Sequence, residues 1–230
     1  MAIVIGAGGG LGAALLTHLQ QGGRYSKVLG LGRSTEVPID YVDEGSIDRA
    51  AQQVAQVLTE SACELRLLIV ASGFLHGAAG QPERSWNHLD AAYLQHVFAI
   101  NAIGPALVMK HFLPLMPKTG CCVAGFLSAK VGSIGDNALG GWYGYRASKA
   151  ALNQLVKTAS IELTRRNKDS VCVALHPGTV DTALSQPFAK TGLKVRPPEE
   201  AAADLLRVLD GLGAAATGSL IDYLGKTLPY

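Results

Sequence analysis

The chain has 230 residues, enough for one large hydrophobic core, and 48% hydrophobic against 17% charged side chains indicate a packed globular protein rather than a disordered one. Twenty basic and 18 acidic side chains give a net charge of +2, and no basic stripe is interleaved with aromatic residues, so nothing favours nucleic acid as a partner. Four cysteines without metal-ligand spacing, mostly within apolar runs, predict buried thiols, no disulfide and no metal site: Cys63, Cys121, Cys122 and Cys172.

The first residues carry no basic segment of the kind that opens a secretory signal, and no uninterrupted apolar run approaches the ~18 residues of a membrane span. We therefore expect a cytoplasmic protein with no membrane partner. No internal repeat, low-complexity tract or linker interrupts the sequence, so a single domain is predicted over residues 1–230.

Residues 2–5 are a short β-branched run that predicts a buried strand, and a glycine-rich turn follows at once. Apolar residues from Leu11 onward then recur at helical spacing, so the glycines connect a strand to a helix. Such a turn suits a diphosphate, because glycines let backbone N–H groups approach it and the helix N-terminus favours its charge. The predicted contacts in this turn are Gly6, Gly10, Leu11 and Gly12.

Residues 27–31 predict a second strand, and Gly32, Arg33 and Ser34 follow it. In a dinucleotide fold the end of this strand meets the adenosine ribose, where an arginine accommodates a 2′-phosphate. Arg33 therefore favours NADP over NAD, the alternative being an ordinary solvated arginine. Residues 37–40 give a weak strand signal that ends in Asp40, a candidate for an adenine edge.

Ser46 is predicted to cap a helix over residues 47–58, and residues 65–71 predict a buried strand that ends at Ser72 and Gly73. Alternating strands and helices predict an α/β fold of the Rossmann type, a doubly wound parallel sheet with helices on both faces. Its ligand is expected at the carboxyl ends of the strands.

Residues 74–90 contain turn signals and are expected to form a surface loop whose histidines have structural rather than catalytic roles. A helix is predicted over residues 91–116, interrupted at Gly104 and Pro105. Asn101 is a polar residue inside this apolar helix and must find partners there. Its spacing fits two roles equally: a helix-kink residue that binds backbone, or a water ligand near an active site.

Residues 120–127 predict a strand that delivers Ser128 to the ligand edge of the sheet. A helix follows in which Tyr145 and Lys149 stand four residues apart and so project from one face. The remaining predicted elements are a strand over 171–175 that ends at His176, Pro177 and Gly178, a helix over 199–209 and a strand over 219–223.

In order and spacing, these residues resemble the short-chain dehydrogenase/reductase family over nearly the whole chain. The resemblance is carried by the glycine turn, the internal Asn101, the strand-end Ser128, the Y-x-x-x-K of Tyr145 and Lys149, and the P-G-x-V-x-T of residues 177–182. The segments GSIGDNALGGWYGYRASKAALN and LHPGTVDT are similar to the C-factor and sniffer-type carbonyl reductases.

The resemblance implies roles for these residues. Tyr145 would donate a proton to a substrate carbonyl as hydride arrives from the nicotinamide. Lys149 would favour the ionised tyrosine and hold the nicotinamide ribose, while Ser128 would bind the substrate oxygen. Asn101 would hold a water that links the lysine to solvent. Val180 and Thr182 would position the nicotinamide carboxamide.

The turns and the resemblance together predict one set of cofactor contacts. They are Gly6, Gly10, Leu11, Gly12, Arg33, Ser34, Asp40, Ser72, Gly73, Asn101, Tyr145, Lys149, Pro177, Gly178, Val180 and Thr182.

The sequence departs from the family pattern in two places. Ile5 and the stretch 70–73 replace residues that the family uses to stabilise the sheet around the cofactor, from which weaker local hydrogen bonding is expected. The family's second serine corresponds to Ala129 when counted back from Gly132, whereas Ser133 lies twelve residues before Tyr145. Ser128 is the first candidate for the catalytic serine and Ser133 the alternative.

The sequence thus predicts an NADP(H)-dependent oxidoreductase of a small carbonyl or alcohol substrate. The alternative is a signalling or regulatory protein, similar to C-factor, that binds the dinucleotide with little turnover. Residues 183–196 fit either part of a pocket lid, with an apolar wall formed by Leu184, Pro187, Phe188 and Leu193, or a plain surface loop. The resemblance implies a homodimer or homotetramer formed through the helices at 91–116 and 145–163.

Overall fold

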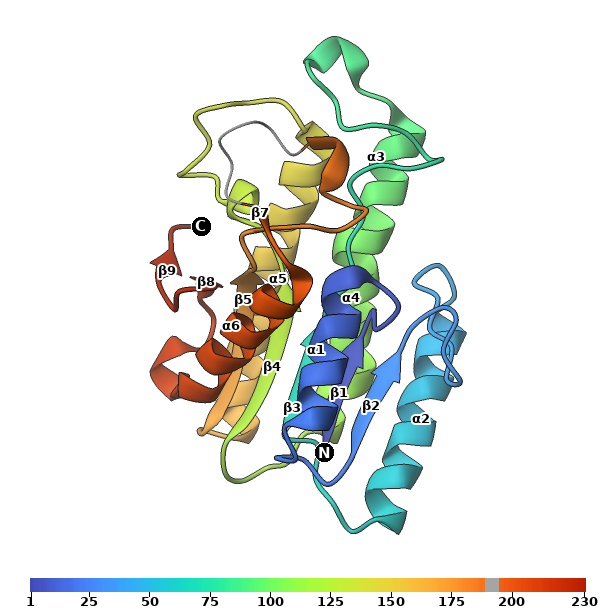
Figure 1. The fold of residues 1–230 in the computed structure, drawn as a ribbon, viewed down its shortest axis with the longest axis vertical. Coiled ribbons are helices and arrows are strands. Elements are labelled where there is room, and N and C mark those ends of the chain that lie inside the picture. Colours follow the sequence, from blue (N-terminus) through green and yellow to red (C-terminus); the bar gives the residue numbers. More distant parts are fainter. Residues whose placement is uncertain (189–194) are drawn as a thin grey trace.

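A seven-stranded sheet runs through the computed structural model, which describes residues 1–188 and 195–230 (Figure 1). Its strands lie in the order β2-β1-β3-β4-β5-β8-β9, and neighbouring strands are parallel except for the antiparallel pair of β8 with β9. This confirms the doubly wound sheet predicted from the alternation of strands and helices. The strands of this sheet are β1 (Ala2–Ile5), β2 (Val28–Leu31), β3 (Leu67–Val70), β4 (Cys122–Leu127), β5 (Ser170–His176), β8 (Leu220–Asp222) and β9 (Thr227–Leu228).

Helices cover both faces of the sheet (Figure 1). On one face α1 (Gly10–Gln21) packs beside α6 (Pro198–Gly211). The other face carries α2 (Glu44–Glu60), α4 (Gly104–Phe112) and α5 (Tyr143–Arg166), and α3 (Ala91–Phe98) packs against α5. Short 3-10 turns lie at Trp86–His88, Leu113–Leu115, Lys130–Gly132, Gln186–Phe188 and Ala214–Ala216.

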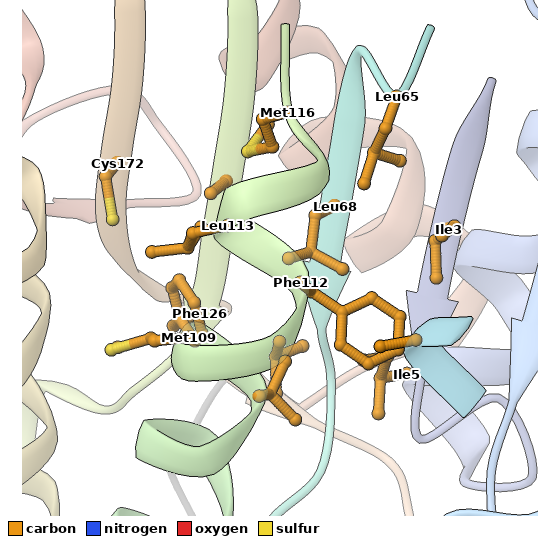
Figure 2. Packing of buried hydrophobic residues seen from close by; sticks show 14 of the residues in the cluster. Ile3, Ile5, Leu65, Leu68, Met109, Phe112, Leu113, Met116, Phe126 and Cys172 are labelled. Carbon is orange, nitrogen blue, oxygen red and sulfur yellow. The ribbon is translucent and has the colours of Figure 1, made fainter. Parts of the chain in front are cut away.

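The hydrophobic core therefore has two halves, one on each face of the sheet. Figure 2 shows part of the larger half, where Phe112 of α4 packs over Ile5 of β1 and Leu68 of β3. Because both faces are covered, all four residues of β1 and of β3 are buried, as expected for central parallel strands.

The long helical stretch predicted over residues 91–116 is interrupted earlier than expected, at a π-helical turn, Ala99–Ile103. Gly104 and Pro105 instead open α4, where a proline in the first turn costs no hydrogen bond. Among the described residues, Ala91–Leu115 is the one stretch long and apolar enough to span a membrane by length and composition. Half of its most apolar window is buried inside the fold, which is the pattern of a helix that covers a sheet.

Two local predictions before α2 were wrong. The strand expected over residues 37–40 is reduced to an isolated bridge between Gly32 and Pro38, because the Thr35 hydroxyl bonds to the Gly32 N–H and to the Val37 carbonyl and closes a turn there. Ser46 is not the cap of α2, which begins two residues earlier; its hydroxyl donates back to the carbonyls of residues 40 and 43.

Three short strands were not predicted: β9, β6 (Thr179–Val180) and β7 (Val195–Arg196), the last two forming a separate parallel pair. The four cysteines are free, and Cys122 and Cys172 are buried as predicted. Cys63, in the turn that follows α2, is half-buried, and Cys121, directly before β4, is exposed.

Candidate active site

The predicted site residues follow five different strands and meet at one edge of the sheet. Gly6 follows β1, Arg33 lies two residues beyond β2, and Ser72 lies two residues beyond β3. Ser128 and Pro177 come directly after β4 and β5. Since these five strands are parallel, their carboxyl ends lie at the same edge of the sheet, and site residues that are far apart in the sequence come together there.

The turn between β1 and α1 is shaped for close approach of backbone. Gly6 has φ +88°, and a Cβ there would lie 2.8 Å from the Ser72 nitrogen. A Cβ on Gly12 would lie 2.1 Å from the Gly6 carbonyl oxygen, so no side chain fits at that position. The glycines are therefore required by the packing of this turn against its own helix and against the end of β3.

The first turn of α1 presents unused hydrogen-bond donors. Gly9 is the N-cap and makes no side-chain cap, and the first turn has no acidic residue. Among the described residues, the N–H groups of Gly10, Leu11 and Gly12 have no backbone acceptor, the first internal bond of the helix being that of Ala13 to Gly9. Open N–H groups at a positive helix end fit the diphosphate of a dinucleotide.

Arg33 and Ser34 are exposed in the turn that follows β2. Within the part of the chain that the structure describes, Arg33 forms no ion pair and its guanidinium is available to a ligand. Asp40 is also exposed, and its Oδ1 accepts a hydrogen bond from the Val42 nitrogen at 3.1 Å, which fixes the carboxylate beside this turn.

Tyr145 and Lys149 are both buried on α5, one helical turn apart, and Lys149 Nζ lies 5.9 Å from the centre of the Tyr145 ring. Nζ donates to the Leu127 carbonyl at 2.8 Å, which ties the lysine to the end of β4. Gly73 lies beside it, since a Cβ there would be 3.5 Å from Nζ. The pair thus stands at the sheet edge where the glycine turn ends.

Burial controls the ionisation of both groups. It lowers the pKa of Lys149 to about 7, and burial followed by the charge of Tyr93 raises the pKa of Tyr145 to about 12. This differs from the expectation that Lys149 lowers the pKa of Tyr145. Near the pH at which Tyr145 would ionise, Lys149 is already neutral, so in the protein alone it offers no charge to the phenolate.

Asn101 lies in the π-helical turn and is fully buried. Its Oδ1 accepts from the Phe74 nitrogen at 2.7 Å, and its Nδ2 donates to the Phe74 carbonyl at 2.8 Å and to Ser148 Oγ at 3.0 Å. These contacts make Asn101 the kink residue that binds backbone, the first of its two expected roles. A direct role as a water ligand remains a prediction.

The two candidate serines are engaged differently. Ser128 Oγ donates to Asn153 Oδ1 at 2.6 Å, and Asn153 Nδ2 donates to the Gly132 carbonyl at 3.3 Å, which fixes the orientation of the amide. Ser133 Oγ accepts from the Asp136 nitrogen at 3.1 Å and so closes the following loop. Ser128 is the nearer in the chain to Leu127, whose carbonyl binds the catalytic lysine candidate.

The segment after β5 returns to the glycine turn. Gly178 has φ +79° and packs on the Tyr223 ring. The Thr182 side chain lies against the start of α1, where a Cβ on Gly10 would be 3.0 Å from its methyl group. Val180 is buried in the core, and its carbonyl accepts a hydrogen bond from Ser185 Oγ. Of the expected pocket wall, Leu184 lies near Gly73, whereas Leu193 lies outside the described residues.

Three residues of the site region were missed by sequence reasoning. Tyr41 bonds through its hydroxyl to Ser72 Oγ at 2.5 Å, Trp142 packs its ring on that of Tyr145, and Glu83 is a buried carboxylate beside the start of α5. Only Trp142 carried a usable signal, as an aromatic residue placed between a glycine pair and the predicted catalytic tyrosine. The other two sit in segments without periodicity.

The chain is similar in sequence and fold to known proteins. A family model described as enoyl-(acyl carrier protein) reductase matches residues 12–207. The chain is 36% identical to the C-signal protein of Myxococcus xanthus over 142 residues, 62% of this chain and 81% of that protein. It is 30% identical to an uncharacterised oxidoreductase of Schizosaccharomyces pombe over 209 residues, 84% of this chain and 77% of that protein.

Solved structures with the same fold include NADPH-bound carbonyl reductase from chicken fatty liver, with a TM-score of 0.83, 25% identity and coverage of 100% of this chain and 98% of the other. The carbonyl reductase Sniffer of Drosophila melanogaster also has a TM-score of 0.83, at 22% identity, with 100% and 99% of the two chains covered.

Proposed function

The chain belongs to the short-chain dehydrogenase/reductase family of oxidoreductases, and from this we propose that it transfers hydride between NADP(H) and a small carbonyl or alcohol substrate. One observation carries the proposal: the buried pair of Tyr145 and Lys149 stands at the same sheet edge as the uncapped start of α1. A site that only bound a dinucleotide would need the uncapped helix start but not the buried pair of Tyr145 and Lys149.

A bound nicotinamide supplies the hydride, and the residues of this chain supply the proton and the positions. Tyr145, protonated up to high pH because burial raises its pKa to about 12, donates its phenolic proton to the carbonyl oxygen. Lys149, held by the Leu127 carbonyl, would bind the nicotinamide ribose, and below a pH of about 7 its ammonium would place a positive charge near the Tyr145 ring. Gly10, Leu11 and Gly12 would hold the diphosphate through their N–H groups.

Ser128 is proposed to bind the developing oxyanion after its hydroxyl rotates away from Asn153. Ser128→Ala is expected to lower kcat by about tenfold to a hundredfold, since one hydrogen bond to that oxygen is lost. Ser133→Ala should change kcat by less than about threefold, because its hydroxyl closes a loop. Steady-state kinetics of the two variants on one aldehyde decide the assignment, and a larger loss in Ser133→Ala would transfer it to Ser133.

Arg33 is proposed to bind the 2′-phosphate that distinguishes NADP from NAD. Arg33→Ala is expected to weaken NADPH binding by about tenfold or more and to leave NADH binding nearly unchanged, because only NADPH carries that phosphate. Fluorescence titration of both nucleotides measures the ratio. Arg24→Ala, which removes an exposed arginine paired with Asp210, is the matched control. An unchanged ratio in Arg33→Ala would exclude this role.

The same family supports further proposals about the whole protein. We propose a cytoplasmic homodimer or homotetramer, supported by the exposed Ile103 and Ile161 on the helices expected to pair, with neither nucleic acid nor a membrane as partner. The similarity to the C-signal protein keeps a second candidate function, a dinucleotide-binding signalling protein with little turnover. NADPH oxidation over a panel of aldehydes and ketones separates the two: the enzyme turns over at least one of them, and tight NADPH binding without any turnover would leave the signalling function.

A further inference from the structure

The start of the catalytic helix α5 is not stabilised by its own sequence. Its N-cap, Trp142, makes no side-chain cap, and the first turn contains no acidic residue. Gly140, Gly141 and Trp142 have φ of +64°, +66° and +54°, so three successive residues are left-handed. For a bulky residue such as Trp142 this conformation is unfavourable and persists only where the surroundings impose it.

Glu83, from the loop between β3 and α3, supplies what the helix start lacks. Both of its carboxylate oxygens accept a hydrogen bond from the Gly144 nitrogen, each at 3.1 Å. Its backbone carbonyl accepts from the Trp142 nitrogen at 2.5 Å. Gly144 is the second residue of α5, and its N–H is one that a local N-cap side chain would normally satisfy. Glu83 therefore holds the residues on both sides of the helix start.

The carboxylate is placed where only a specific partner can stabilise it. Glu83 is 2% exposed, and a buried carboxylate is costly unless hydrogen bonds or an opposite charge compensate it. Among the described residues it has no cationic partner, so the positive end of α5 serves as its counter-charge. The fit needs Gly144, since a Cβ there would lie 3.0 Å from the Glu83 carboxylate and 3.0 Å from Leu94.

The two residues that Glu83 holds are the immediate surroundings of Tyr145. Gly144 precedes it in the chain. Trp142 packs edge-on against its ring, with the ring centres 6.1 Å apart and the planes at 79°. Tyr93 completes this contact zone: its ring lies beside Gly144, and its hydroxyl is fixed by the Leu75 carbonyl at 2.7 Å. Displacement of the helix start would therefore move the Tyr145 ring and the aromatic residue that supports it together.

We propose that Glu83 is a positioning residue, which clamps the first turn of α5 and thereby holds the Tyr145 hydroxyl in line with the substrate carbonyl. The proposal rests on the proposed function, since Tyr145 is the group to which that function assigns proton transfer. It concerns orientation rather than cofactor affinity, because Glu83 touches the helix start and none of the turns assigned to the dinucleotide.

The test compares Glu83→Ala with Glu83→Gln, whose amide oxygen has the same reach and still accepts from Gly144. Glu83→Ala is expected to lower kcat per NADPH-binding site by about tenfold or more, with NADPH affinity and substrate KM within about threefold of the parent. Glu83→Gln should restore kcat to within about threefold of the parent. Glu60→Gln, an exposed glutamate on α2, is the control for loss of a charge. A purely structural role would lower the number of folded, NADPH-binding molecules and leave kcat per site unchanged, which would overturn the proposal.

A second readout works without turnover and separates this proposal from the proposed function. The chain has 2 tryptophans, and Trp86 is 72% exposed, so in a Trp86→Phe background the emission reports Trp142 alone. Glu83→Ala should shift that emission and Glu83→Gln should not; an identical spectrum in all three proteins would overturn the clamp even if no carbonyl compound is reduced. Should Glu83→Ala fail to fold, Glu83→Asp replaces it, because its carboxylate is one methylene short. Glu83→Asp is expected to lower kcat per site by about threefold or more and to shift the Trp142 emission. Unchanged kcat and unchanged emission in this variant would contradict the proposal.

Discussion

Tyr145→Phe is expected to lower kcat for carbonyl reduction by about 10²–10⁴-fold, the usual contribution of a positioned general acid. The substitution removes a single oxygen from a buried ring, so packing against Trp142 is kept. NADPH affinity should stay within about threefold of the parent, because Tyr145 is one of many predicted cofactor contacts and the diphosphate is proposed to bind at the first turn of α1. Stopped-flow oxidation of bound NADPH under single turnover measures the chemical step directly.

Tyr143→Phe is the matched control for this substitution, since it removes the same atom two residues earlier, from a side chain that is only partly buried. It should react within about twofold of the parent. If Tyr145→Phe reduced carbonyl compounds at the parent rate, proton donation by Tyr145 would be wrong whatever the cofactor affinity.

The second large effect concerns Lys149, whose pKa burial lowers from 10.5 to about 7. Below that pH the ammonium is charged and above it neutral, so activity that needs the charge is present at low pH and is lost as the pH rises through about 7. The value of kcat/KM for NADPH, which reports the free enzyme, should fall by about tenfold per pH unit on the alkaline side. The proton of Tyr145 cannot cause this fall, because its pKa lies near 12.

Two substitutions of Lys149 test this assignment. Lys149→Met is expected to lower kcat/KM by about 10²-fold or more at every pH, because both the charge and the bond to the Leu127 carbonyl are lost. Lys149→Arg keeps a permanent charge, so whatever activity remains should lose the alkaline fall. A parent profile that is flat between pH 6 and 9, or an arginine variant with the same fall as the parent, would contradict the role given to the ammonium.

The sequence predicted the framework well because the framework is local. A strand buried on both faces appears in the sequence as an apolar run. A tight turn into a helix, in which side chains do not fit, appears as a run of glycines. β1 and the turn to α1 could therefore be located from neighbouring residues alone. The ends of β4 and β5 could be recognised in the same way. Because the two strands pair in parallel, Ser128 and Pro177, which follow them, lie at the same edge of the sheet. The positions that could bind a dinucleotide follow from this topology.

What could not be predicted depends on contacts between distant segments. Glu83 reads as one more charged residue in a loop, and only the folded chain brings its carboxylate to the Gly144 nitrogen, 61 residues away. The same holds for Asn101, whose amide binds the Phe74 backbone 27 residues earlier. The ionisation of Tyr145 and Lys149 depends on the folded chain in the same way: spacing shows that the two are near, but not that burial lowers the pKa of Lys149 to about 7 and raises that of Tyr145 to about 12.

The measurement that tests the central claim most directly is the fate of the transferred hydride. The protein is incubated with NADPH that carries deuterium at the transferable position of its nicotinamide and with each aldehyde or ketone of the panel. We predict an alcohol with one deuterium on the former carbonyl carbon, detected by mass spectrometry, and none of it with Tyr145→Phe in the same time. Tight binding of NADPH with no deuterated alcohol from any compound would contradict the assignment of this chain as a reductase.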